Sequence, residues 1–425
     1  METKSMKIAI INKSDSTGGA AVVSFRLMEA LRRAGADARM VVMEKRTDSP
    51  YVSLAATGAK SRIPFLKERL KIFVENGFNR DTLFKVDTGS DGLDLLKDPA
   101  VKDADVLLIN WVNQGMLSLE GVKRLSEAGK KIIWTMHDMW CYTGVCHHSG
   151  ECERYEHTCY PCPLLKKAML PSLAERVQKK KKRVYGVSDI HFVAVSNWLA
   201  DRAQRSSLFG GKRPTVIPNA FPFDNQQYIP SKTRNKGGED KEFRILFGAA
   251  RLDDSVKGLP ILIEATRILA ERWSGQASKM RLVTFGEAKN PEALDGIAIA
   301  HTHLGRISGK ENLRKVYEES DAVVSTSLYE TLPGTLVEGQ AYGCVPVAFL
   351  RGGQGDIIDH RQTGYLAEWS DDFKEGALHI AEGLIWAMEN VDEDMRREMF
   401  NSAYNRFSED KIAARYLELI CPDKS

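Results

Sequence analysis

Two glutamates stand on either side of a Pro-Gly break in the stretch "SLYETLPGTLVEGQAYG". Glu330 precedes Pro333 and Gly334, and Glu338 follows them in a run with helical spacing that begins near Thr335. The first backbone N–H groups of a helix have no partner within it, so such a start attracts a phosphate or a polar sugar. Carboxylates repel phosphate and accept from hydroxyl groups. We therefore expect Glu330 to bind sugar hydroxyls and Glu338, in the first turn, to chelate a vicinal diol such as ribose.

Cations that could bind a diphosphate occur in the stretch "GAARLDDSVKGLP". Arg251 ends a strand-like run and Lys257 precedes a helical one, so one planar and one point charge could neutralise a leaving diphosphate. Charge builds up on that group in the transition state, where fixed cations act most strongly. Taken singly, each of the four charged side chains is better explained as a surface or helix-terminal residue. Their combination favours a functional site.

Five of the seven cysteines lie between residues 141 and 162, directly after His137 and Asp138 at the end of another strand-like run. The segment ends in Cys-x-x-Cys, a common half of a tetrahedral zinc site, but its other spacings are irregular. A structural zinc ion held by four thiolates and a set of reduced or redox-active thiols therefore stay open as alternatives. The candidate ligands are Cys141, Cys146, Cys152, Cys159 and Cys162.

A basic run, Lys179–Arg183, lies within a helical pattern. Such a run could contact an anionic membrane surface or a lipid diphosphate acceptor. A solvated helix face is an equally good interpretation of the same charges.

Apolar runs typical of strands alternate with helical patterns along the chain, which predicts βαβ units and parallel sheets. The length of 425 residues predicts two doubly wound α/β domains. We expect an N-terminal domain at 1–225 with a cysteine-rich insert at 141–162, a C-terminal domain at 226–407, and a last helix at about 408–421 that packs back on the first domain. Ligands bind at the carboxyl ends of the strands in such sheets, so the cleft between the domains is the expected site. The expected strands are 7–12, 38–43, 105–110, 131–136, 190–195, 243–250, 280–286, 321–327 and 344–349.

The nearly balanced charge, with 60 basic and 57 acidic residues, argues against a nucleic-acid binder. The first apolar run is too short for a secretion signal, and no run reaches the roughly 20 apolar residues that span a bilayer. An odd number of cysteines also argues against a disulfide framework. We therefore expect a cytoplasmic protein, at most peripheral to the inner face of the membrane.

Together these residues resemble the retaining nucleotide-sugar glycosyltransferases of family 4, which have the GT-B architecture of two facing Rossmann-like domains. The resemblance rests on the pair Arg251 and Lys257 and on the element from Glu330 to Glu338. It spans nearly the whole chain, because further matching stretches lie at 16–35, 195–203, 216–221 and 344–358.

The resemblance implies catalytic roles for four residues. Arg251 and Lys257 correspond to the clamp on the donor diphosphate, and Glu330 to the residue that binds the hydroxyls of the donor sugar. His137 matches a histidine near the reacting face of the sugar. No metal ion is required for this chemistry, because the cationic side chains replace it.

The resemblance also implies donor-binding roles. Glu338 corresponds to the ribose ligand, and Gly18 and Gly19 match a turn that closes on the donor phosphates. The segment after Glu330 completes this set with Leu332, Pro333, Gly334 and Thr335.

The residues and the resemblance predict a hexosyltransferase that moves a sugar, with retention, from a nucleotide-diphosphate sugar of the UDP or GDP type to a glycan or lipid-linked glycan. The expected setting is the biosynthesis of a capsule, an exopolysaccharide or an O-antigen. Family members usually carry Phe-Gly after the first glutamate, where this chain has Thr331 and Leu332, so the base and the sugar stay undetermined. The alternatives are a sugar-nucleotide epimerase of GT-B architecture, with His137 as an acid/base group, and a non-catalytic zinc-binding module.

Overall fold

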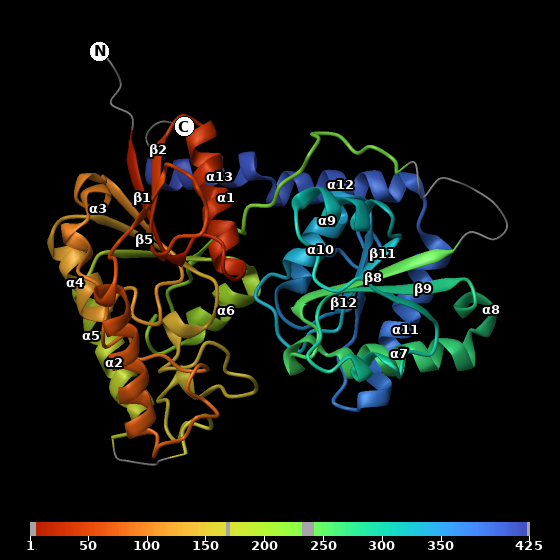
Figure 1. Ribbon diagram of the computed structural model, residues 1–425, viewed down its shortest axis with the longest axis horizontal. Coiled ribbons are helices and arrows are strands. Elements are labelled where there is room, and N and C mark those ends of the chain that lie inside the picture. The colour runs from red at the N-terminus through yellow and green to blue at the C-terminus, as the bar shows by residue number, and fades with distance from the viewer. Residues whose placement is uncertain (1–5, 167–170, 232–241, 423–425) are drawn as a thin grey trace. The chain divides into compact units, whose positions relative to one another are not determined.

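The chain folds around two parallel sheets in a computed structural model that describes residues 6–166, 171–231 and 242–422 (Figure 1). One unit comprises Met1–Ala220 and Glu409–Ser425, and the other comprises Phe221–Ser408. We expected the boundary after residue 225; the chain passes into the second unit after Ala220 and returns to the first after Ser408. The prediction of two Rossmann-like α/β units is confirmed.

The first unit has a seven-stranded sheet in the order β3-β2-β1-β4-β5-β6-β7, with every paired strand parallel. The interior strand β1 pairs Ile8 with Ala38 of β2 on one side and with Val106 of β4 on the other. The order changes direction between β1 and β4, so the loops after these two strands diverge and leave room for a ligand. The strands are β1 (Lys7–Ser14), β2 (Asp37–Glu44), β3 (Val52–Leu54), β4 (Val106–Ile109), β5 (Lys131–Met136), β6 (Ile190–Ala194) and β7 (Thr215–Val216).

Helices cover both faces of this sheet. The last of them, α13 (Glu409–Ile420), packs against α1 (Gly19–Arg33) and contributes Ile412 and Tyr416 to the core around β1. The Tyr416 hydroxyl also lies 2.8 Å from the hydroxyl of Thr135. The other helices of this unit are α2 (Ala59–Glu75), α3 (Pro99–Asp103), α4 (Leu119–Glu127), α5 (Leu173–Val187) and α6 (Asn197–Arg205).

The second unit has a six-stranded parallel sheet in the order β10-β9-β8-β11-β12-β13. The chain builds outward from β8 to β10, then returns to the other side of β8 with β11. The switch point between β8 and β11 is therefore the place where this sheet can bind a ligand. The strands are β8 (Phe243–Arg251), β9 (Met280–Glu287), β10 (Ala300–His303), β11 (Ala322–Ser325), β12 (Val345–Phe349) and β13 (Tyr365–Ala367).

Two layers of helices enclose the second sheet. α7 (Leu259–Arg272) and α11 (Phe373–Asn390) pack against each other, as do α10 (Gly334–Ala341) and α12 (Glu393–Phe407). Aliphatic residues of α7, α11 and alternate residues of the strands form one continuous core. The remaining helices are α8 (Ser274–Ala277) and α9 (Lys310–Glu318). Across the described residues, no helix is long and apolar enough to cross a membrane.

Candidate functional site

An ion pair occupies the switch point of the second sheet. Lys257 lies in the 3-10 turn just before α7, and Glu330 lies in the loop between β11 and α10. The Lys257 ammonium is 2.5 Å from a carboxylate oxygen of Glu330, with the side chains 31% and 20% exposed. Both charges are therefore within reach of a ligand and are held together by their pairing.

The loop that carries Lys257 is fastened to the end of β11. The Thr326 hydroxyl donates to the carbonyls of Lys257 and Gly258 at 3.0 Å each, and Leu328 N–H donates to Val256 at 2.8 Å. Gly258 has a φ of 69°, and a Cβ there would lie 2.0 Å from the Thr326 carbonyl oxygen. Only glycine fits this approach, so the backbone fixes the origin of the Lys257 side chain.

Two further glycines fix the loop that carries Glu330. Gly353 N–H donates to the Glu330 carbonyl at 2.8 Å, and a Cβ on Gly353 would lie 2.0 Å from the carbonyl oxygen of Thr331. Gly352 is also close, because a Cβ added there would lie 2.3 Å from the carbonyl oxygen of Glu330. The glycine pair within 344–358 thus supports the glutamate from behind.

The residues after Glu330 form the start of α10. Leu332 is buried, Pro333 caps the helix in an extended conformation, and Gly334 begins it with no acidic residue in the first turn. Thr335 is the second helical residue and is half-buried. A helix start of this kind carries partial positive charge that favours an anion or a polar sugar.

Glu338 lies just beyond the first turn of α10. The helix begins at Gly334, which makes Glu338 its fifth residue, so the prediction that it lies in the first turn is wrong. The buried Tyr317 donates its hydroxyl hydrogen bond to Glu338 at 3.3 Å and stacks on Tyr342 with ring centroids 5.7 Å apart. This pairing holds the Glu338 carboxylate in one direction.

Arg251 ends β8 and pairs with a different acid. Its guanidinium donates twice to Asp253, at 3.2 Å each, and its side chain is 48% exposed. These hydrogen bonds raise the pKa of Arg251. The structure therefore joins Lys257 to Glu330 and Arg251 to Asp253. Asp253 was missed in the sequence, although it stands only two residues after the arginine.

Gly18 and Gly19 lie at the start of α1, directly after β1. Gly18 caps the helix with a φ of 88°, and a Cβ on either glycine would meet no protein atom within 4 Å. The hydroxyl oxygen of Ser14 accepts from the N–H groups of Ser16 and Thr17, which shapes the turn. The turn is exposed and leaves space at the helix start.

His137 follows β5 and is partly buried. Its Nε2 lies 2.8 Å from the side-chain oxygen of Asn110, at the end of the neighbouring strand β4. Burial lowers the pKa of His137 to about 4, although Asp138 opposes this shift. The imidazole is therefore neutral near pH 7.

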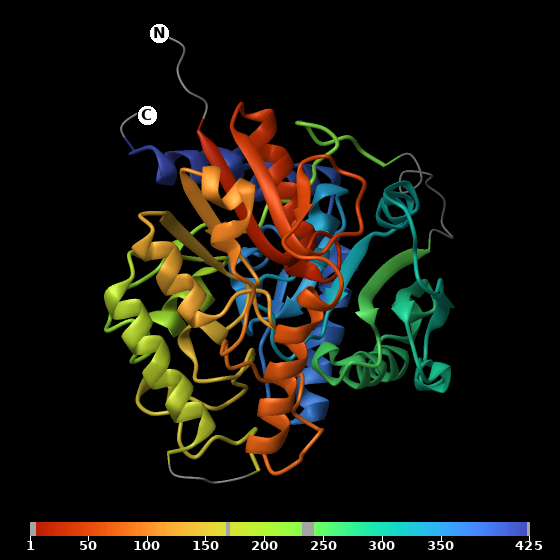
Figure 2. The same cartoon turned by 60° about the vertical axis from the view of Figure 1, so that its left-hand side comes forward.

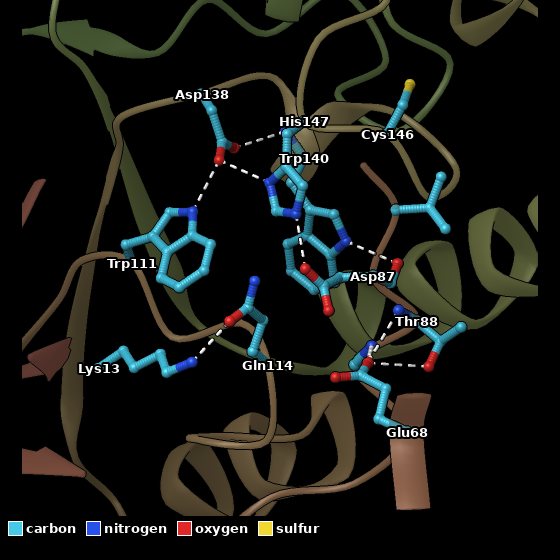
Figure 3. Close-up of polar contacts among 12 residues, drawn as sticks. Lys13, Glu68, Asp87, Thr88, Trp111, Gln114, Asp138, Trp140, Cys146 and His147 are labelled. Carbon is cyan, nitrogen blue, oxygen red and sulfur yellow. Dashed lines mark hydrogen bonds and ion pairs between the residues drawn. The ribbon is translucent and has the colours of Figure 1, made fainter. Parts of the chain in front are cut away.

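A second histidine, His147, forms a charged network in the first unit that the sequence did not reveal (Figure 3). It lies 2.7 Å from Asp138 and 2.6 Å from Asp87, and Trp111 donates its indole N–H to Asp138 at 2.8 Å. Although burial opposes charge, Asp138 and Asp87 raise the pKa of His147 to about 10. The imidazolium therefore ties the cysteine-rich segment to Asp138, after β5, and to Asp87, in the segment after α2.

Four of the predicted cysteine ligands line one small cavity of about 20 Å³, which has room for one water-sized species. Within the parts of the chain that the structure describes, no group of three or more metal-binding side chains lies close enough to hold an ion. In the described parts of the chain, which include all seven cysteines, no disulfide is formed, and Cys141 is buried outside this cavity. The zinc ion thus stays a prediction, and its four candidates are Cys146, Cys152, Cys159 and Cys162.

The basic run Lys179–Arg183 is not a continuous exposed face. Lys181 is fully buried, where its ammonium donates to the carbonyl of Trp140 and, at 3.1 Å each, to those of Thr143 and Gly144. It also lies 3.6 Å from the centre of the Trp140 ring. One of the five charges therefore holds the cysteine-rich segment in place, which corrects our interpretation of the run as a purely external surface.

A larger cavity of about 540 Å³ lies in the first unit, between the carboxyl ends of β1 and β2 and the start of α2. Lys13 lies in its wall, 2.5 Å from the Gln114 side-chain oxygen and 3.7 Å from Glu44. Burial lowers the pKa of Lys13. The cavity is lined by Lys13, Met43, Glu44, Ser61, Arg62, Phe65 and Leu66.

Comparison with known proteins finds similarity in both sequence and fold. Residues 231–406 match the family described as glycosyl transferases group 1. The putative colanic acid biosynthesis glycosyl transferase WcaC of Escherichia coli (strain K12) is 24% identical over 283 residues, which are 64% of each chain. The match thus covers less than two thirds of that relative.

Two solved structures share the whole fold. The crystal structure of Anabaena Alr3699/HepE in complex with UDP has a TM-score of 0.60 at 15% identity, and covers 98% of this chain and 100% of its own. A glycosyltransferase from Rickettsia africae ESF-5 has a TM-score of 0.61 at 15% identity, with 99% and 100% covered. The chain therefore has the GT-B fold, and its second unit carries the sequence pattern of group 1 glycosyl transferases.

Proposed function

We propose that this chain is a retaining hexosyltransferase that moves a sugar from a nucleotide-diphosphate donor to a glycan or a lipid-linked glycan. The observation that carries the proposal is the 2.5 Å pair of Lys257 and Glu330 at the switch point of the second sheet, within the region matched to group 1 glycosyl transferases. A cation for phosphate and an acceptor for sugar hydroxyls are thereby placed side by side between two helix starts.

On donor binding, the phosphates would replace the carboxylate partners of two cations. Lys257 would leave Glu330 and Arg251 would leave Asp253 as both turn to the diphosphate, and Glu330 would then accept from the sugar hydroxyls. Negative charge develops on the departing diphosphate, so fixed cations stabilise the transition state more than the ground state. We propose that this chemistry needs no metal ion and that any zinc would be structural.

Glu338 is the proposed ligand of the ribose diol. Tyr317 donates to its carboxylate at 3.3 Å and so orients it from the protein side, and a carboxylate can accept hydrogen bonds from the two hydroxyl groups of a diol. The UDP complex of HepE, which shares the fold, supports a donor of the UDP type.

The proposed setting is the cytoplasmic synthesis of a cell-surface polysaccharide. The name of the WcaC relative, which refers to colanic acid, supports a role of this kind. The acceptor would then be a growing glycan, carried on a lipid in the pathways that build polymers at a membrane.

Calorimetric titration with UDP, GDP and ADP tests the donor site in wild type, Glu338→Ala and Glu311→Ala. Glu311 is an exposed acid in the first turn of α9 and serves as the matched control. We expect one nucleotide to bind wild type and Glu311→Ala equally, and Glu338→Ala about tenfold or more weakly, because two charge-assisted hydrogen bonds are lost. Equal binding by all three proteins, or no binding by folded wild type, would overturn the proposal.

A further inference from the structure

Helix α2 (Ala59–Glu75) exposes its large apolar side chains. Ile63, Leu66, Leu70 and Val74 are 46%, 59%, 62% and 45% exposed. Their spacing of three, four and four residues puts them along one side of the helix. Of the thirteen exposed large hydrophobic residues in the described parts of the chain, six lie between residues 63 and 84, so this apolar surface is concentrated.

The opposite side of α2 is buried and carries charge. Glu68 and Arg69 are buried there, and Arg69 forms ion pairs with Glu68 at 3.3 Å and with Asp87. Glu68 also accepts from the N–H groups of Thr88 and Gly89, at 2.9 and 2.8 Å. If the helix were rotated to bury its apolar side, these ion pairs and hydrogen bonds would be exposed to solvent. They therefore fix the orientation in which the charged side of α2 is buried and its apolar side is exposed.

Basic residues border the apolar side. The exposed basic residues of α2 are Lys60, Arg62, Lys67 and Lys71. Of its two acidic residues, Glu68 is buried and Glu75 pairs with Arg176 of α5. Both helices belong to the first unit and can be followed in Figures 1 and 2, α2 in orange and α5 in yellow-green. An exposed apolar stripe bordered by cations alone is complementary to an anionic lipid surface.

We propose that α2 lies in the plane of an anionic lipid surface and inserts Ile63, Leu66, Leu70 and Val74 between the headgroups. Phe78 and Phe84, which follow the end of the helix in the chain, are also exposed, at 66% and 61%. A second copy of the chain is a poorer occupant, because it would bring the same cations against one another. This moves the membrane contact from the basic run, where Lys181 is buried, to α2.

The same helix leads into the cavity of about 540 Å³. Arg62, Phe65 and Leu66 of α2 line it together with Lys13. A lipid surface along α2 would therefore lie beside the entrance of this cavity, which suits the polar head of a lipid-linked acceptor. This last step rests on the proposed function, whereas the membrane contact does not.

Vesicle co-sedimentation of the full chain tests the contact. The vesicles contain equal parts of phosphatidylglycerol and phosphatidylcholine, or phosphatidylcholine alone. We expect wild type to bind the anionic vesicles, and the double variant Ile63→Ser/Leu70→Ser to bind about tenfold or more weakly. The double variant Ile229→Ser/Phe373→Ser removes two comparably exposed apolar residues of the second unit and should bind as wild type does.

A second double variant tests the basic residues that border the apolar side of α2. Lys67→Glu/Lys71→Glu should weaken binding at low ionic strength and matter less in high salt, because surface charges are screened. Equal sedimentation of wild type and Ile63→Ser/Leu70→Ser, or equal binding of wild type to neutral and anionic vesicles, would overturn the proposal. So would a wild-type dimer in solution that ignores vesicles and dissociates in Ile63→Ser/Leu70→Ser.

Nucleotide titration of the same proteins separates the two proposals. We expect Ile63→Ser/Leu70→Ser to bind nucleotide as wild type does, because α2 belongs to the first unit and the donor residues Lys257, Glu330 and Glu338 to the second. Vesicle binding without any nucleotide binding would support the lipid contact and overturn the proposed function.

Discussion

Lys257 and Glu330 form an ion pair in this structure, with 2.5 Å between the ammonium and the carboxylate. Each stands where a helix begins and is held by backbone contacts that only glycine allows. An ion pair of this kind keeps both groups ordered until a ligand competes for them. Its value lies in preorganisation, since partly exposed pairs contribute little to stability.

Replacing Lys257 separates catalysis from folding. In Lys257→Met we expect kcat/KM for sugar transfer to fall by about two to three orders of magnitude, because the charge on the leaving diphosphate loses a fixed cation. The midpoint of thermal unfolding should change little, since the pair is partly exposed. Arg267→Met removes a cation of α7 that pairs with Glu264 at the surface, and should retain wild-type activity. A Lys257→Met enzyme with wild-type kcat/KM would contradict the assigned role.

The close approach of Gly353 to Thr331 gives a second prediction. Gly353→Ala places a Cβ 2.0 Å from a carbonyl oxygen, so the loop after Glu330 must shift. We expect a loss of about 1–3 kcal/mol in the free energy of unfolding and weaker nucleotide binding. Gly275→Ala in α8 meets open space and should be neutral or stabilising by up to about 1 kcal/mol. Urea denaturation of both variants, followed by nucleotide titration, measures this contrast.

The His147 network makes stability depend on pH. Its pKa is raised to about 10 in the folded protein, so the folded state holds a proton that the unfolded state releases near pH 6.5. The stabilisation is fully present below about pH 6.5 and is lost as pH rises toward 10. We expect the free energy of unfolding of wild type, relative to His147→Gln, to decline across this window in urea titrations. A surface variant, His379→Gln, should follow wild type; a wild type parallel to His147→Gln would show that His147 is neutral.

Metal analysis decides between the alternatives for the cysteines. A zinc ion would have to draw the four cavity thiols together and deprotonate them, because burial holds the pKa of Cys146 at about 12 and that of Cys159 at about 11. If zinc is bound, we expect about one ion per chain in wild type and in Cys141→Ser, and none in Cys159→Ser. Protein purified without chelator that contains no zinc would leave reduced or redox-active thiols as the remaining interpretation.

Much of the fold was predictable from the sequence because buried parallel strands have a strong local signal. The runs around β1, β4 and β8 are continuous and apolar, and each is followed by turn or helix-start residues. The short strands β3, β7, β10 and β13 were missed, because pieces of two to four residues at or near a sheet edge depend on their neighbour for hydrogen bonds. Helix α2 gave no sign of its orientation, because its pattern of apolar residues does not tell which side is buried.

The sequence by itself determined the two doubly wound units and the residue types at the switch point, because strand alternation, Gly-Pro breaks and charge placement are local properties. Only the tertiary structure decided the pairing of those charges: Lys257 with Glu330, Arg251 with Asp253, and Glu338 with Tyr317. It also decided that Lys181 is buried and that Leu70 is exposed. Apart from the local pair of Arg251 and Asp253, these are contacts between separate segments of the chain or choices of helix orientation, and tertiary packing selects among them.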